Sequence, residues 1–272
     1  MPTIKQLKEK QKSVKSIHKT TSAMEMISTS KSRKALLLNQ EFKPFLFETM
    51  SIIKTVIENQ TTIKEKTYNK TLWLLISSDI GLAGGFNSNI VKEFLREKKP
   101  GDEVIAIGKK LHSSLGARNI EHTHYSLAQA KEVGTQDEIS MRLMKAYFED
   151  TEIKSVYTKY ESQIDFKATI KILLPVTISE DDNLETITNI DFEPSANNIL
   201  LSMLPLYLSA SLNGLIKESE VSEHSARRVA MENATTNGEE IMNDLNVQYN
   251  KQRQAKITQE ISEIVGGTEA LK

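Results

Sequence analysis

The sequence contains no cysteine among its 272 residues, which excludes disulfides, cysteine-ligated zinc, iron–sulfur clusters and thiol catalysis. Glycine and proline are scarce, at 11 and 6 residues, and aromatic residues make up 6%. These values disfavour an all-β sandwich or barrel, which needs many turns. No apolar run reaches the ~18 residues of a membrane-spanning helix, and no apolar segment follows the first lysines. Neither a transmembrane segment nor a signal peptide is therefore expected.

The net charge of −1 conceals an asymmetry along the chain. Residues 1–34 hold nine basic and two acidic residues, whereas residues 196–272 hold seven basic and ten acidic ones. The first segment thus carries +7, the last −3 and the middle −5. A basic arm on a nearly neutral chain favours an acidic partner, which can be a nucleic acid, a membrane surface or a protein.

Two long stretches are almost free of helix-breaking residues and predict long helices over 3–57 and 196–272. Pro44 and Pro205 are potential kinks, and Ser195 or Asn197 is a potential cap of the second helix. The apolar residues of the first helix form i,i+3 pairs separated by polar residues, a stripe that favours a coiled-coil seam over burial in a globule. The pairs are Ile4/Leu7, Val14/Ile17 and Met24/Ile27, and the polar residues are Gln11, His18 and Thr21.

The length of the second helix limits where it can lie. At 1.5 Å per residue, about 65 residues span roughly 100 Å. A compact globule of this chain length is only about 50 Å across. We therefore expect the helix to leave its own domain, with one part paired to the first helix and the rest bare or held by other chains.

The middle of the chain alternates short β-branched runs with helical patterns. Strands are expected at 71–77, 104–107 and 120–125, helices at 88–98 and 137–149, and an edge hairpin at 153–161 and 166–176. The β-α-β order predicts a doubly wound parallel sheet with the hairpin appended. The expected fold is α/β: a long antiparallel coiled coil of the terminal helices (1–57 and 196–272) plus a small Rossmann-like domain (70–195).

The segment Asp79–Asn87 follows the first strand and precedes a helix, where a phosphate-binding loop would lie. Its spacing matches neither G-x-G-x-x-G nor G-K-[ST]. We interpret it as a structural turn, in which Gly81, Gly84 and Gly85 provide positive φ and close backbone approach. Nucleotide binding there is the less favoured alternative.

Other candidate groups have simpler interpretations. His122 and His124 flank Thr123 and can begin a metal site, but no third ligand is evident, so a surface strand face is favoured. Trp73 is expected in the core, and Asp181-Asp182 in a solvated turn. No nucleophile–base constellation is visible, and no catalytic residue, metal or cofactor is expected. A site assembled from distant residues stays open.

Four segments, in order along the whole chain, carry a resemblance to a known family. They are A-M-E-M-I-S-T-S-K-S-R-K within 15–34, S-S-D-I-G-L-A-G-G-F-N at 77–87, S-E-H-S-A-R-R-V-A-M-E-N-A-T-T-N at 222–237, and Y-N-K-Q-R-Q-A-K-I-T-Q-E-I-S-E-I-V-G-G at 249–267. Together they resemble the γ subunit of F-type rotary ATP synthases. Ala83 stands where relatives often have cysteine.

The resemblance implies a non-catalytic central shaft, present as a single copy, that turns inside a ring of three α and three β subunits. The sheet domain would lie against the ε subunit and the membrane c-ring, on the cytoplasmic face of a bacterial cell membrane. ATP would be made in the β subunits. Residues matching those that contact β are Met24 at the shaft neck, the cations Lys31, Arg33 and Lys34, and Arg227, Gln254, Thr258 and Glu260.

Two alternatives from other classes remain. A coiled-coil scaffold or a basic-arm nucleic-acid binder also explains the charged arm and the long helices, and it predicts steeply salt-dependent DNA binding. It does not explain the polar residues near the C-terminus. An enzyme that uses the α/β domain is the third possibility, and nucleotide titration tests it.

Overall fold

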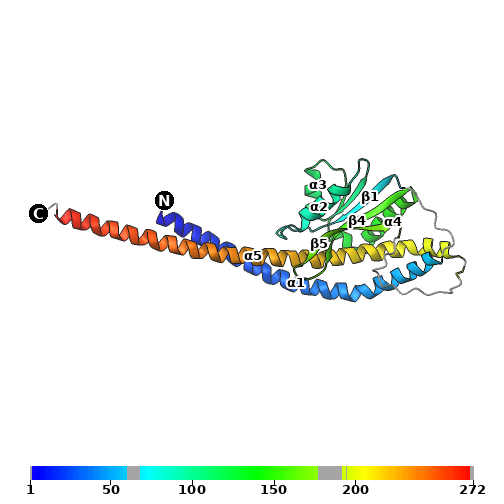
Figure 1. Cartoon of the computed structure of the whole chain (residues 1–272), viewed down its shortest axis with the longest axis horizontal. Coiled ribbons are helices and arrows are strands. Elements are labelled where there is room, and N and C mark those ends of the chain that lie inside the picture. Colours follow the sequence, from blue (N-terminus) through cyan, green and yellow to red (C-terminus); the bar gives the residue numbers. More distant parts are fainter. Residues whose placement is uncertain (1, 60–67, 177–191, 194, 270–272) are drawn as a thin grey trace. The chain divides into compact units, whose positions relative to one another are not determined.

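The computed structural model describes residues 2–59, 68–176, 192–193 and 195–269. The chain divides into two compact units, one formed by residues 1–27 and 228–272 and the other by residues 28–227. Figure 1 labels the five α-helices and the strands β1, β4 and β5. In chain order the elements are α1 (Ile4–Glu58), β1 (Lys70–Ile76), α2 (Phe86–Glu97), β2 (Glu103–Ile107), α3 (Lys109–Gly116), β3 (Thr123–Tyr125), a 3₁₀ turn (Gln129–Lys131), α4 (Val133–Phe148), β4 (Thr151–Tyr160), β5 (Phe166–Leu174) and α5 (Ala196–Glu269). Asp181-Asp182 lies outside the described residues.

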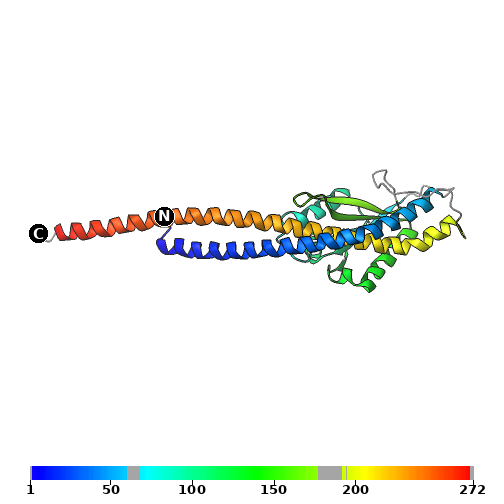
Figure 2. The same cartoon turned by 90° about the horizontal axis from the view of Figure 1, so that it is seen from below.

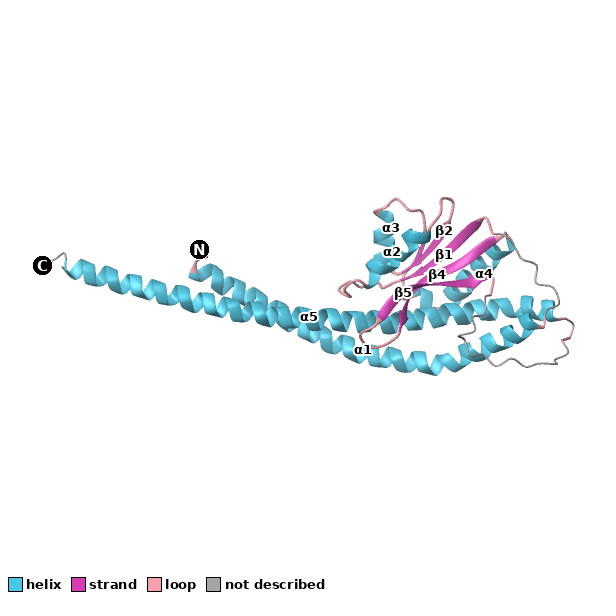
Figure 3. Ribbon diagram, viewed as in Figure 1, coloured by secondary structure: helices cyan, strands magenta, loops and turns pink. Residues whose placement is uncertain are grey.

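The larger unit, residues 28–227, contains a five-stranded sheet of order β3-β2-β1-β4-β5 (Figure 3). All neighbouring strands are parallel except the antiparallel pair β4–β5. The expected parallel sheet is therefore confirmed, but the expected edge hairpin is only half right. β4 lies inside the sheet, in parallel register with β1 from Lys70↔Thr151 to Leu75↔Val156, and only β5 is an edge strand. β4 pairs with β1 on one side and with β5 on the other, and most of its side chains are buried.

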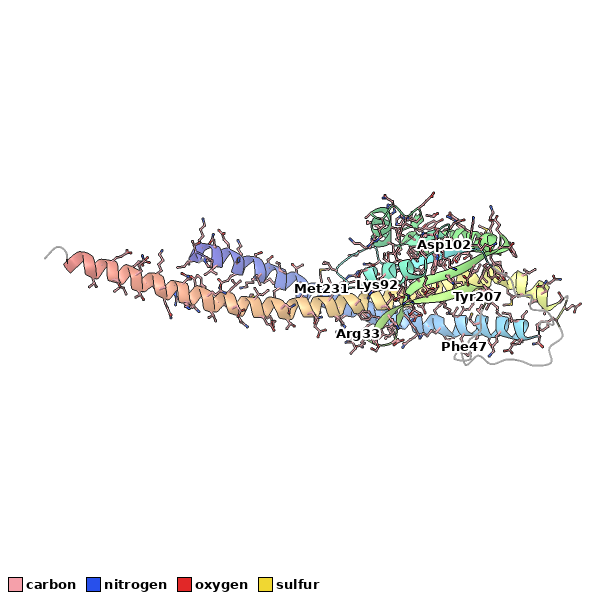
Figure 4. The ribbon with its side chains drawn as sticks, turned by 45° about the horizontal axis from the view of Figure 1, so that its top comes forward. Arg33, Phe47, Lys92, Asp102, Tyr207 and Met231 are labelled. Carbon is pink, nitrogen blue, oxygen red and sulfur yellow. The ribbon has the colours of Figure 1, made fainter. Side chains whose placement is uncertain are left out.

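Both faces of the sheet are covered, as the unbroken apolar run in β1 predicts. Leu72, Leu74 and Ile76 face one core, which includes Tyr207 of α5 and also Ile53 of α1 and Ile139 of α4. Trp73 and Leu75 face the other core, with Phe94 of α2 and Leu115 of α3. Trp73 is 1% exposed, as expected, and its Nε1 donates a hydrogen bond to Oδ2 of Asp102 at 2.9 Å. Figure 4 labels Asp102 and Tyr207 in this unit.

The start of α5 uses one of its two expected caps. Asn198 N donates to Oγ of Ser195 at 3.3 Å, and Ile199 N donates to the Ser195 carbonyl at 3.1 Å. Pro44 and Pro205 lie inside α1 and α5, so neither proline divides its helix in two. Among the described residues, α5 alone is long and apolar enough to cross a membrane, although half of its most apolar window is buried, as in a core helix.

In the smaller unit, the ends of α1 and α5 run side by side and antiparallel (Figure 2). Three cross-helix hydrogen bonds set the register, because the α5 partner number falls as the α1 number rises. Gln11 Nε2 donates to Asn246 Oδ1 at 2.8 Å, His18 Nε2 lies 3.1 Å from Glu239 Oε1, and Thr235 Oγ1 donates to Thr21 Oγ1 at 3.0 Å. Gln11, His18 and Thr21, the polar residues that separate the apolar pairs, are thus part of the seam itself.

The spacing of the covered positions explains this difference. On α1 the covered positions Ile4, Leu7, Gln11, Val14, His18 and Thr21 alternate steps of three and four, the 3.5-residue repeat of a coiled coil. Ile17 and Ile27 fall off this repeat and are 56% and 55% exposed. The i,i+3 pairs Val14/Ile17 and Met24/Ile27 were therefore a wrong prediction of the buried stripe, although the seam itself is present.

Candidate functional site

The turn at residues 79–87, in the larger unit, is held by its own polar side chains. Asp79 Oδ1 accepts hydrogen bonds from the backbone N–H of Lys109 at 2.9 Å and of Leu127 at 3.1 Å. Asn87 Oδ1 accepts from both N and Oγ of Ser78, at 3.2 and 2.9 Å. The turn is therefore tied to the start of α3, to the segment after β3 and to the end of β1.

The three glycines of this turn have different roles. Gly84 has a φ of 56°, whereas a Cβ on Gly81 or Gly85 would lie 3.3 Å from the side chain of Lys110 or Asn89. Leu82 also has a positive φ, of 60°, which is unusual for a residue with a side chain. This geometry fits a structural turn.

The same turn is poorly suited to phosphate. In doubly wound sheets, phosphates bind at the carboxyl ends of the strands. Here the Asp79 carboxylate, bonded to Lys109 N and Leu127 N, already takes backbone donors at those ends, and it would repel a phosphate.

Sequence reasoning missed two residues at this edge. One is Asp79 as the capping carboxylate. The other is Gly108, where φ is 108° and a Cβ would lie 2.5 Å from Oγ and 2.7 Å from the carbonyl oxygen of Ser77. The available signal was a glycine placed between an apolar strand and a helix.

Arg227, at the α5 end of the larger unit, is 6% exposed. Its Nη2 donates to the carbonyl of Ile80 at 3.0 Å and to Glu223 Oε1 at 2.7 Å, and its Nε donates to the carbonyl of Gly81 at 3.2 Å. The guanidinium thus holds a carboxylate and two loop carbonyls, as expected of its forked shape, but these groups belong to its own chain. The contact of Arg227 with β stays a prediction.

Burial shapes the electrostatics around Arg227. It raises the pKa of Glu223, and the charge and hydrogen bond of Arg227 oppose that rise. Burial, followed by the charges of Arg227 and Lys31, lowers the pKa of His224 to about 4. His224 is therefore neutral at pH 7, and its Nδ1 can accept a hydrogen bond from Arg227 Nη1, 3.3 Å away.

The basic segment of α1 divides between the two units. Lys31, Arg33 and Lys34 are exposed in the larger unit, and Figure 4 labels Arg33. Met24, in the smaller unit, is half-buried, while Met26 is 68% exposed.

The end of α5, in the smaller unit, is bare. The seam on α5 ends at Gln252, and every residue from Arg253 to Val265 is exposed. Thr258 Oγ1 donates to the backbone carbonyl of Gln254 at 3.0 Å, so the two residues share one face, and Glu260 lies 3.6 Å from Lys256. Apolar residues recur along the same segment, with Ile257, Ile261 and Ile264 at 47%, 55% and 67% exposure.

A third histidine joins the two identified in the sequence. His112 Nδ1 lies 2.9 Å from His122 Nε2, and the rings of His112 and His124 are 4.4 Å apart. His112 was not predicted, because it lies on α3 and meets His122 only in the folded chain. Burial and the two neighbouring imidazoles lower the pKa of His124. Nevertheless, no group of three or more histidine or acidic residues in the described ranges is arranged to hold a metal ion.

Comparison with solved structures shows the class of fold, which this chain shares with chains of mitochondrial ATP synthase rotors and central stalks. A chain of the Euglena gracilis mitochondrial ATP synthase rotor matches with a TM-score of 0.67 at 19% identity, over 93% of this chain and 98% of that one. A chain of the Tetrahymena thermophila mitochondrial ATP synthase central stalk and c-ring matches with a TM-score of 0.61 at 23% identity, over 79% and 99%.

Sequence comparison then gives the family. The ATP synthase family model matches residues 3–271. The ATP synthase gamma chain of Mesoplasma florum is 36% identical, over 100% of this chain and 99% of its own length. That of Clostridium novyi is 38% identical, over 97% and 96%. The chain belongs to the ATP synthase gamma chain family.

Proposed function

We propose that this chain is the rotating central shaft of an F-type ATP synthase. In this role it couples ion flow through a membrane c-ring to ATP synthesis or hydrolysis in an α₃β₃ ring. The β subunits perform the chemistry, and the shaft forces their conformational cycle by presenting different contacts at different angles. One copy serves each complex, the ε subunit lies against the sheet domain, and the complex sits on the cytoplasmic face of a bacterial cell membrane.

The observation that carries this proposal is the exposed segment from Arg253 to Val265. A bare helix end with isoleucines at about half exposure is costly in water unless another chain surrounds it. The segment also carries polar groups, including Gln254 and Thr258, which an ordinary self-associating coiled coil would place off its seam. A polar and apolar surface of this kind fits a socket in which the helix end must turn.

The neck residues fit the same interpretation. Lys31, Arg33 and Lys34 are exposed cations within about one turn of α1. Exposed ion pairs are individually weak, about 0–1 kcal/mol, so acidic partner groups can exchange between them during rotation. Met24, seven residues before Lys31, contributes a flexible, uncharged side chain.

The test uses purified complexes that carry Gln254→Leu or Thr258→Val. If a loop of β bonds to these two side chains in only one rotary state, their removal slows the step that needs that state. A hydrogen bond is worth about 0.5–1.5 kcal/mol, so we expect steady-state ATP hydrolysis to fall roughly two- to tenfold. Subunit content should stay normal, because the paired seam ends at Gln252.

The matched control is Gln259→Leu. Gln259 lies on the same bare segment, and its Nε2 donates to Glu263 Oε1 of its own helix at 2.9 Å. Turnover should be near wild type in this variant. Wild-type turnover in the Gln254 and Thr258 variants would exclude these contacts, and a chain that fails to copurify with an ATPase would exclude the shaft assignment.

A further inference from the structure

The guanidinium of Arg227 links a helix to the tip of a turn. Besides His224 Nδ1, it bonds to the carbonyls of Ile80 and Gly81 in the turn and to the carboxylate of Glu223 one helical turn earlier on α5. Arg227 and Glu223 are 6% and 5% exposed. A buried ion pair of this kind is well ordered only when each charge keeps its partners, since removing one leaves the other uncompensated.

The tip that Arg227 holds is unusual in two respects. Ile80 and Leu82 are 59% and 62% exposed, although the polar residues of the turn point inward to internal partners. Leu82 has a φ of 60°, a left-handed conformation that residues with a side chain adopt only when surrounding bonds enforce it. The turn therefore presents two apolar side chains in a fixed, strained conformation.

The base of the turn is fixed separately. Asp79 binds Lys109 N and Leu127 N, and Asn87 binds Ser78, so both ends of the turn are attached to the sheet and its helices. Between these anchors, Arg227 is the residue that attaches the tip to α5. Without it, the carbonyls of Ile80 and Gly81 would lose their charged donor.

We propose that Arg227 and Glu223 are a positioning pair that fixes the tip of the 79–87 turn to α5, so that a force on Ile80 and Leu82 passes into the helix without bending the turn. Arg227 then acts on coupling through the turn and not by touching another subunit. The coupling part of this inference rests on the proposed function; the geometric part does not.

A direct contact between Arg227 and another chain would have different consequences for Glu223 than the positioning role. The guanidinium would have to leave Glu223, stranding a carboxylate that is 5% exposed. Under direct contact, Glu223 would be dispensable for coupling. Under the positioning role, Glu223 and Arg227 matter equally, because each holds the other in place.

The experiment compares two i,i+4 ion pairs of α5. Arg227→Gln and Glu223→Gln remove the positioning pair, while Arg228→Gln and Glu232→Gln remove the neighbouring pair, whose Nη1–Oε2 distance is 3.0 Å. Two quantities are measured: amide hydrogen exchange of residues 80–85, in the isolated chain and in the complex, and the ratio of ion pumping to ATP hydrolysis in the complex.

We expect Arg227→Gln and Glu223→Gln each to raise exchange in the turn about tenfold or more and to lower the pumping ratio to a similar extent. The double variant should be no worse than either single variant, because the two residues act as one unit. The Arg228 and Glu232 variants should leave both quantities unchanged.

Unchanged exchange in the Arg227→Gln variant overturns the inference. So does a loss of coupling in Arg227→Gln that Glu223→Gln does not share, which would indicate direct contact. If the glutamine variants fail to assemble, Arg227→Lys keeps the charge but loses the fork, and it should still raise turn exchange in the isolated chain; no rise there overturns the inference too. Failure of the proposed function is distinguishable, because the exchange result would stand while no ATPase copurifies.

Discussion

Met24 is half-buried on α1, seven residues before the exposed Lys31, and its side chain is long, flexible and uncharged. We predict that Met24→Lys lowers ion pumping more than ATP hydrolysis in the complex. A lysine at this position can pair with a carboxylate of a partner subunit at one rotary angle of the shaft. That attraction lowers the free energy of the complex at this angle and so opposes further rotation. The measurement is pumping and hydrolysis on the same preparation.

The control for this prediction is Met24→Leu, which keeps an apolar side chain of similar volume. Its coupling should match wild type. Equal loss of pumping and hydrolysis in Met24→Lys, or loss of neither, would contradict the placement of Met24 at the neck.

His224 gives a pH prediction with a definite sign. Its pKa of about 4 in the folded chain is below the ordinary value of 6.5, so the unfolded chain takes up the proton first as the pH falls. The stability that neutral His224 contributes is complete above pH 6.5 and is lost as the pH falls from 6.5 to 4. In melting experiments by circular dichroism, the melting temperature should fall less over this window in His224→Gln than in wild type. Parallel pH profiles would refute the buried, neutral state.

At the scale of single residues, the sequence indicated which side chains make polar contacts but not which residues are their partners. Arg227 was singled out only as a residue that matches a contact with β, and its partners within the chain, Glu223, Ile80 and Gly81, were not predicted. A single sequence does not show that residue 227 meets residue 80, because that contact depends on how α5 packs on the sheet. His112 was missed beside His122 for the same reason.

At the scale of helices and strands, local sequence patterns predicted an element correctly where its side chains are uniformly apolar and buried. The apolar run of β1 predicted a strand buried on both faces, and every residue of β1 after the exposed Lys70 is buried. The position of β4 was missed, since strand order depends on long-range pairing. On α1, the lack of helix-breaking residues predicted the helix, but the apolar pattern did not predict which face is covered. Half of the seam positions in 4–21 are polar, and a search for apolar residues does not find them.

The turn at 79–87 supports a prediction about ligands. Isothermal titration of the chain with ATP and with ADP, each with Mg²⁺, should show no binding at this turn. The reason is that Asp79 already occupies the backbone donors at the carboxyl ends of the strands. Micromolar binding that Asp79→Asn strengthens would refute the structural interpretation and favour the enzyme alternative.

At the scale of the whole molecule, stability is unequally divided between the two units. Both hydrophobic cores consist of residues between Ile53 and Ala226, all inside the larger unit. In the described part of the smaller unit, the buried apolar side chains are Leu7, Met231 and Leu245, and none of them belongs to either core. The larger unit therefore has the burial needed for independent folding, and the smaller one has little.

We predict that residues 28–227, expressed alone, unfold in one cooperative calorimetric transition within a few degrees of the main transition of the full chain. The removed residues contribute nothing to either core. The fragment should also self-associate less, since it lacks the exposed isoleucines of the α5 end. A fragment without a cooperative transition would show that the helix ends are needed to fold the sheet domain.

The cross-helix hydrogen bonds of the smaller unit also bear on biosynthesis. Gln11 pairs with Asn246, 235 positions later in the chain. At about 5–20 residues per second, a ribosome makes the first residue roughly 10–50 s before the second. During that interval the N-terminal half of α1 lacks the α5 residues with which it pairs. The polar residues of its seam, Gln11, His18 and Thr21, reduce the apolar surface that α1 exposes before α5 is made. The same residues that leave the finished seam with few apolar contacts therefore lower non-specific association with chaperones and other nascent chains.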